Sequence, residues 1–75
     1  MRYPDGETVR LGDRVELSAG FEGTVVCSID TKEFSSNFPE DQWSYLREGV
    51  LIQTESGLIH CLEADEDFRL IERAR

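Results

Sequence analysis

"GDRVELSAGFEGTVVCSID", residues 12–30, is the stretch that decides the fold. Apolar and charged residues alternate over residues 14–17, and a period of two is typical of a strand with one buried face. Gly20 and Gly23 follow, and glycine tolerates the positive φ that the tip of a hairpin requires. A second apolar run over residues 24–30 resumes the strand pattern. The stretch therefore predicts an antiparallel hairpin.

The same period assigns side chains to the two faces of these strands. In the second strand we expect Val25, Cys27 and Ile29 to lie on one face and Val26 on the other. In the first strand region, which bends at residues 12–13, the residues that share one face are Val9, Leu11, Val15 and Leu17. The hairpin thus has one apolar face that can cover a core.

Residues 31–49 interrupt this β pattern. They open with a polar, serine-rich loop, and Pro39 is then followed by two carboxylates, which favour the first turn of a helix. Gly49 suits the position just after a helix. We expect a short helix near residues 39–47.

The remaining sequence predicts three further strands. Two apolar runs flank Gly57 within residues 50–62 and indicate a hairpin, with Leu51 on the face opposite to that of Val50 and Ile52. A short closing strand follows near residues 68–72. The 75 residues leave room for one domain only, spanning residues 1–75. We expect a mainly-β fold: a small, strongly bent barrel of about five antiparallel strands with one short helical insertion.

The opening stretch resembles the KOW motif of SH3-like barrels in ribosomal proteins and transcription elongation factors. The residues that match it are Gly12, Asp13, Val15, Gly20, Gly23, Val25 and Ile29. The resemblance implies an SH3-like barrel, and it implies an RNA-binding or transcription- and translation-associated adaptor as one candidate function.

The charge of the chain disfavours nucleic acid as the partner. The formal net charge is −8, and residues 30–67 hold ten acidic residues against only Lys32 and Arg47. Phosphate binding needs clustered Lys and Arg, whereas an acidic surface attracts a basic protein. An acidic protein-binding module is therefore the first functional hypothesis, and the KOW-like adaptor is the alternative.

The second half of the chain, from "VVCSIDTKEFS" through "DQWSYLREGVLI" to "EADED", resembles a group of small uncharacterised bacterial proteins. Such proteins are encoded beside polymorphic toxins, and the resemblance implies an inhibitor or immunity protein. The sequence contains no secretory signal and no apolar run long enough for a membrane span, so we expect a cytoplasmic protein.

The sequence offers little for catalysis. His60 is the only histidine, and it stands in a strand pattern beside Cys61. Together with Cys27 these residues lack the closely spaced ligand pair of a zinc site, and we expect packed, reduced thiols. We expect no enzyme activity, no metal and no cofactor.

Two groups of residues are candidates for binding a protein partner. Four aromatic residues crowd the insertion: Phe34, Phe38, Trp43 and Tyr45. Some of them are expected to cover an end of the barrel, and one or two to remain as interface anchors. The second group is the acidic turn of Asp65, Glu66 and Asp67, which is either a solvated turn or a rim for a basic partner.

Overall fold

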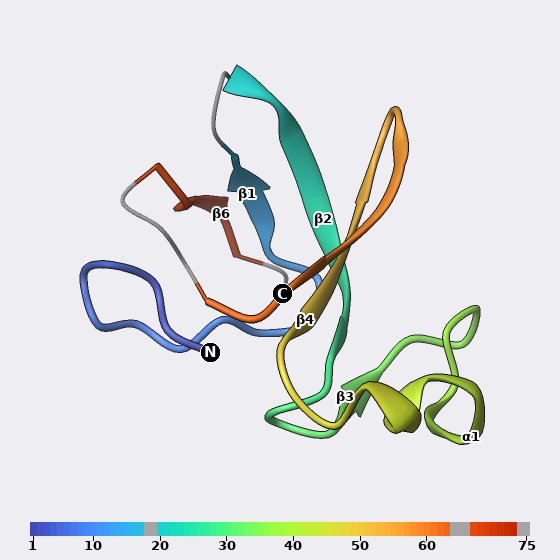
Figure 1. Cartoon of the computed structure of the whole chain (residues 1–75). Coiled ribbons are helices and arrows are strands. Elements are labelled where there is room, and N and C mark those ends of the chain that lie inside the picture. Colours follow the sequence, from blue (N-terminus) through green and yellow to red (C-terminus); the bar gives the residue numbers. More distant parts are fainter. Residues whose placement is uncertain (18–19, 64–66, 74–75) are drawn as a thin grey trace.

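The computed structural model describes residues 1–17, 20–63 and 67–73 (Figure 1). It confirms a mainly-β fold, with six antiparallel strands in one sheet. The strands are β1 (Arg14–Glu16), β2 (Glu22–Ser28), β3 (Glu33–Phe34), β4 (Val50–Thr54), β5 (Gly57–Cys61) and β6 (Arg69–Glu72). The prediction of about five strands omitted the two-residue β3, which lies inside the insertion.

The predicted helix is present. An α-helical turn, α1 (Glu40–Trp43), continues directly into a 3₁₀ turn, η2 (Ser44–Leu46). Pro39 precedes α1 in an extended conformation, and Glu40 and Asp41 occupy the first turn, where carboxylates favour the positive end of the helix. No helix in the described part of the chain is long and apolar enough to cross a membrane.

The sheet is open along its path of paired strands. The order is β5-β4-β2-β1-β6, with β3 pairing β2 off this path, so that β5 and β6 are the two end strands. No ladder joins β5 to β6 among the described residues. The sheet nevertheless bends around a core (Figure 1). Closure into a barrel stays a prediction.

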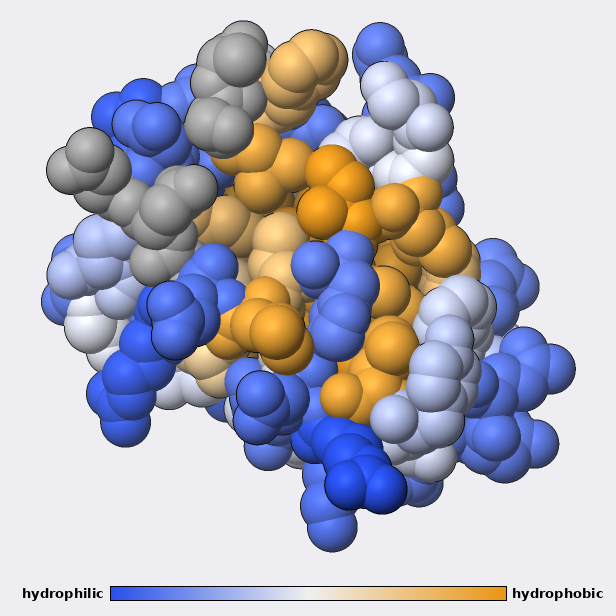
Figure 2. Space-filling view, in the orientation of Figure 1, coloured by the Kyte–Doolittle hydropathy of each residue, from blue (hydrophilic) through white to orange (hydrophobic). Residues whose placement is uncertain are grey.

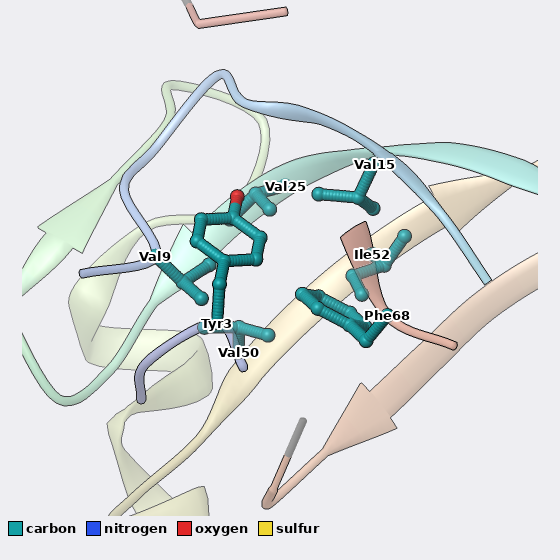
Figure 3. Packing of buried hydrophobic residues seen from close by; sticks show 7 residues of the cluster. All are labelled: Tyr3, Val9, Val15, Val25, Val50, Ile52 and Phe68. Carbon is teal, nitrogen blue, oxygen red and sulfur yellow. The ribbon is translucent and has the colours of Figure 1, made fainter. Parts of the chain in front are cut away.

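The core lies on the inner face of this bent sheet (Figure 3). Its buried members come from nearly every part of the chain: Tyr3, Val9, Val15, Val25, Val50, Ile52 and Phe68. The rings of Tyr3 and Phe68 stack with centroids 5.4 Å apart, and this contact joins the beginning of the chain to the segment before β6. The seven side chains therefore join the beginning of the chain, the three central strands β1, β2 and β4, and the segment before β6.

A carboxylate is buried beside this core. Asp13 is fully buried, and its Oδ2 accepts hydrogen bonds from the Tyr3 hydroxyl at 2.6 Å and from the Arg10 amide at 3.0 Å. Its Oδ1 lies 3.5 Å from Nε of Arg73. Burial, together with the hydrogen bond to Asp13, raises the pKa of Tyr3 far above its ordinary value. The aspartate of the KOW-like stretch thus has a structural role.

One expectation about the faces is wrong. Val25 pairs with Ile52, but Cys27 pairs with Leu51, so two steps along β2 correspond to one step along β4. This β-bulge at Val26 moves Cys27 to the face of Leu51, opposite the core face of Val25 and Ile52. Both Cys27 and Leu51 are buried, yet neither belongs to the core cluster. The sheet is therefore covered on both faces at this point.

Candidate protein-binding site

The aromatic residues of the insertion are partly exposed. The Trp43 ring stacks on that of Tyr45 with centroids 6.3 Å apart, and it meets the Phe38 ring at 5.8 Å in a tilted arrangement. Tyr45 is 69% exposed, and it is the most exposed of the four; Phe34, Phe38 and Trp43 are half-buried. We call Phe38, Trp43 and Tyr45 the aromatic patch. Its most exposed member is Tyr45, whose ring stacks on that of Trp43.

The inner side of the insertion covers the outer face of the sheet. The Cys27 thiol lies 3.3 Å from the Phe38 carbonyl oxygen, and burial raises the pKa of this thiol. Phe34 pairs with Cys27 across β3 and β2, on the same face as Leu51. One part of the insertion therefore covers the outer face of the sheet rather than an end of a barrel, and Tyr45 faces solvent; the role of an aromatic residue as an interface anchor stays a prediction.

A strained turn closes the insertion. The Glu48 amide donates to the Leu46 carbonyl at 2.8 Å, which makes Arg47 the central residue of a γ-turn with φ of 70°. This turn is rare and strained for a residue with a side chain. Gly49 follows with φ of 92°, and a Cβ atom there would collide with the Cys61 carbonyl oxygen. Backbone strain of this kind persists only where neighbouring contacts hold it.

Those contacts come from His60 and Asp30. His60 Nε2 lies 2.9 Å from the Glu48 carbonyl oxygen, although the histidine side chain is otherwise exposed. Asp30 Oδ1 accepts the Gly49 amide at 3.1 Å, and its Oδ2 lies 2.6 Å from the Met1 amino nitrogen. Burial opposes ionisation of Asp30, but these two hydrogen bonds outweigh it and lower its pKa. His60 is thus an exposed strand residue whose imidazole contacts the end of the insertion.

The Trp43 side chain has an unpaired donor. Its indole Nε1 is buried and has no hydrogen-bond partner. A buried donor without an acceptor costs about 1–3 kcal/mol. The ring contacts of Trp43 with Phe38 and Tyr45 must offset this cost.

The structure describes only one residue of the predicted acidic turn. Asp65 and Glu66 lie outside the described residues. Asp67 lies two residues before the start of β6 in the sequence, and β6 is on the side of the molecule opposite the insertion (Figure 1). The acidic side chains nearest the patch in sequence are Glu40, Asp41 and Glu48. The role of residues 65–67 as a rim for a basic partner therefore stays a prediction.

Arg10 and Arg14, which precede the tip of the KOW-like hairpin, are engaged in ion pairs. Arg10 Nε lies 2.8 Å from Glu33 Oε1, and Arg14 Nη2 lies 2.9 Å from Glu22 Oε1. A phosphate group would have to compete with these carboxylates for both guanidinium groups. The hairpin thus presents neutralised rather than free positive charge.

Groups suited to chemistry do not converge. The bulge places Cys27 on the outer face of the sheet, whereas Cys61 packs against the core. In the described ranges, no three His, Cys, Asp or Glu side chains gather closely enough to hold a metal ion.

A second apolar surface was missed in the sequence. A groove of about 340 Å³ lies on the open side of the sheet, where an apolar band is exposed (Figure 2). We call it the seam groove; its lining is Leu17, Phe21, Thr54, Ser56, Ile59, Cys61, Glu63 and Phe68. Phe21 is 59% exposed and Ile59 is 40% exposed. The signal available in the sequence was Phe21, a large apolar residue at the tip of a hairpin.

Comparison with known proteins adds no relative: no protein-family model, no curated protein and no solved structure matches this chain.

Proposed function

We propose that this protein is a non-enzymatic, acidic protein-binding module that covers the surface of a basic partner with its insertion, residues 31–49. The observation that carries the proposal is Tyr45, which is 69% exposed yet held in place by stacking on Trp43. Aromatic residues are enriched at the centres of protein interfaces, because they bury a large area for little loss of conformational entropy.

The anchoring of the insertion supports the same role. The strained turn at Arg47 is fixed by Asp30 and His60, so the backbone that follows the aromatic patch is ordered before binding. A pre-ordered segment loses less entropy on association than a flexible loop. Strain maintained by specific contacts is a frequent property of functional segments.

The negative charge of the chain favours a positively charged partner. A net charge of −8 accelerates encounter with a basic surface and repels polyanions. The carboxylates of α1 and Glu48 are the acidic groups nearest the aromatic patch in sequence, and residues 65–67 add further negative charge to the chain. The specific form that we propose is a bacterial cytoplasmic inhibitor of the immunity type, which acts by steric blockage.

Affinity capture with matched variants tests the proposal. Wild-type protein, Tyr45→Ala and the control Ile71→Ala are immobilised and exposed to an extract of the source organism. Ile71 is also exposed, at 48%, but it lies on β6 away from the insertion. We expect a basic protein to be retained by wild type and Ile71→Ala and lost with Tyr45→Ala. Equal capture by all three baits, or capture of acidic proteins only, would contradict the proposal.

A further inference from the structure

We propose that an extended apolar segment flanked by Lys or Arg, belonging to a protein partner, binds along β5 as an added strand and places side chains in the seam groove. The proposal rests on the proposed function only in taking the partner to be a basic protein. It concerns a different surface from the aromatic patch, and it specifies the secondary structure of the bound segment.

β5 has a free edge. It is the last strand of the sheet and pairs only with β4 among the described strands. In an antiparallel pair, alternate residues direct their N–H and C=O groups away from the partner strand. Such an edge is a template for another extended chain, which gains main-chain hydrogen bonds by adding to it.

β5 also lacks the features that usually protect an edge strand. Its sequence, "GLIHC", contains no Lys, Glu, Asp or Pro, and its register with β4 is regular from one end to the other. The opposite end strand, β6, carries Arg69 and Glu72, and its pairing with β1 is interrupted by a bulge. Charges and bulges are standard protection against edge-to-edge pairing. The contrast marks β5 as the edge left open for a partner.

The seam groove lies beside the exposed part of β5. Ile59 pairs with Ile52, so the Ile59 side chain lies on the core face, and it lines the groove together with Phe21 and Phe68. Alternate side chains of a strand added at β5 would face the same side as Ile59. Apolar residues at these positions would cover surface that is now open to water.

The acidic residues around β5 favour Lys or Arg at the two ends of the bound segment, and they disfavour pairing of β5 with a second copy of this chain. Residues 48–68 contain six acidic residues and neither Lys nor Arg. Glu55 precedes β5 along the chain and Glu63 follows it. Neither has an ion pair within the described part of the chain. Pairing two β5 strands would bring these carboxylates together, whereas Lys or Arg at each end of the bound segment would meet them.

Titration of the full-length ¹⁵N-labelled protein with a defined peptide tests the inference. The probe is the capped peptide KKVTVTVKK, which alternates apolar residues between basic ends. One control peptide has Glu in place of every Lys, and a second carries an N-methyl group on every residue of its central VTVTV segment, so that neither edge of that segment can donate backbone hydrogen bonds. We expect saturable amide shifts at Leu58, Ile59 and His60 that weaken with salt. Both control peptides should bind at least about tenfold more weakly.

Protein variants separate this site from the aromatic patch. Ile59→Thr keeps a β-branched residue in the strand but removes apolar surface, and it should weaken the peptide about fivefold or more. Tyr45→Ala should leave peptide affinity unchanged within about twofold. Absence of saturable shifts at low salt, equal binding of the N-methylated peptide, or shifts confined to the insertion would overturn the inference. Partner capture by the Tyr45→Ala variant tests the aromatic patch, whereas peptide titration tests β5 and the seam groove. Either proposal can therefore fail without the other.

Discussion

Asp30 and Gly49 are joined by a hydrogen bond that closes the insertion at its base: Asp30 Oδ1 accepts the Gly49 amide at 3.1 Å. The two residues stand at the two ends of residues 31–49, and the Ile29 amide adds a second link by donating to the Gly49 carbonyl at 2.9 Å. The aromatic patch therefore projects from a loop whose two ends are hydrogen-bonded to each other, and we call the contacts of Gly49 with Asp30 and Ile29 the clasp. Weakening the clasp should affect the stability of the fold and the order of the patch together.

Substitution of Asp30 tests the clasp. Asp30→Ala removes the acceptor of the Gly49 amide and the contact with the Met1 amino nitrogen, and it should lower the free energy of unfolding by about 1–2 kcal/mol. Asp30→Asn keeps an acceptor for Gly49 but loses the charge, so it should cost less. Urea denaturation measures both values. Equal stability of Asp30→Ala and wild type would show that the clasp contributes nothing to folding.

A pair of glycine variants tests the strained junction before β4. Gly49 and Gly57 both have positive φ, 92° and 130°, but only at Gly49 would a Cβ atom meet another group, the Cys61 carbonyl oxygen. Gly49→Ala should therefore be less stable than Gly57→Ala by about 2 kcal/mol, since both carry a conformational cost and only one carries the collision. Thermal unfolding of the two variants side by side measures the difference. Similar melting temperatures would contradict it.

Acid should destabilise the protein through Glu33. Hydrogen bonds from the Arg10 guanidinium, with others from Thr31 and the Leu11 amide, lower the pKa of Glu33 from 4.5 to about 2. Because the folded pKa lies below the unfolded value, this stabilisation is complete above about pH 4.5 and is lost as the pH falls toward 2. The lowered pKa of Asp30 acts in the same direction.

Melting temperatures measured from about pH 5 to about pH 2 check this dependence. Glu33→Gln should flatten the curve in that range, whereas Glu55→Gln, which changes an exposed turn residue without an ion pair among the described residues, should leave its slope unchanged. The effect should be modest, because the Arg10 side chain is 51% exposed and solvent screens the pair. A Glu33→Gln curve as steep as that of wild type would contradict the prediction.

The sequence was sufficient to predict those parts of the fold that follow from local patterns. The position of α1 and η2 followed from Pro39 and Gly49, and the opposite faces of Leu51 and Ile52 followed from the period of two. The face of Cys27 could not be predicted, because a bulge changes the register through pairing with a distant strand. Nothing in "TVVCSID" itself marks Val26 as the extra residue.

The candidate surfaces were less accessible to sequence reasoning. The aromatic residues of the insertion stand out by composition, but their division into buried and exposed members depends on tertiary packing, which leaves Tyr45 outermost. The seam groove unites Phe21 and Ile59, which are far apart in sequence and belong to different hairpins. Only the bend of the sheet brings them together. A pattern with a period of two therefore identifies neither residue as part of a shared surface.

The KOW-like stretch should not bind RNA in the wild-type protein. Arg10 and Arg14 are paired with Glu33 and Glu22, and the net charge of −8 repels phosphate at long range. We expect no electrophoretic mobility shift with single-stranded or hairpin RNA even at low salt, where electrostatic attraction is strongest.

The double variant Glu22→Gln/Glu33→Gln supplies the opposite case for the RNA test, a protein that is expected to bind. It releases both guanidinium groups and lowers the negative charge while leaving the strands intact, so weak binding that falls steeply with salt should appear. The magnitude should remain small, because two free arginines neutralise only about two phosphates. Salt-sensitive binding by the wild-type protein itself would show that phosphate displaces the carboxylates from Arg10 and Arg14. The ion pairs would then be a means of regulating access to the hairpin, and the RNA-associated adaptor would replace the protein-binding module as the better account of this chain.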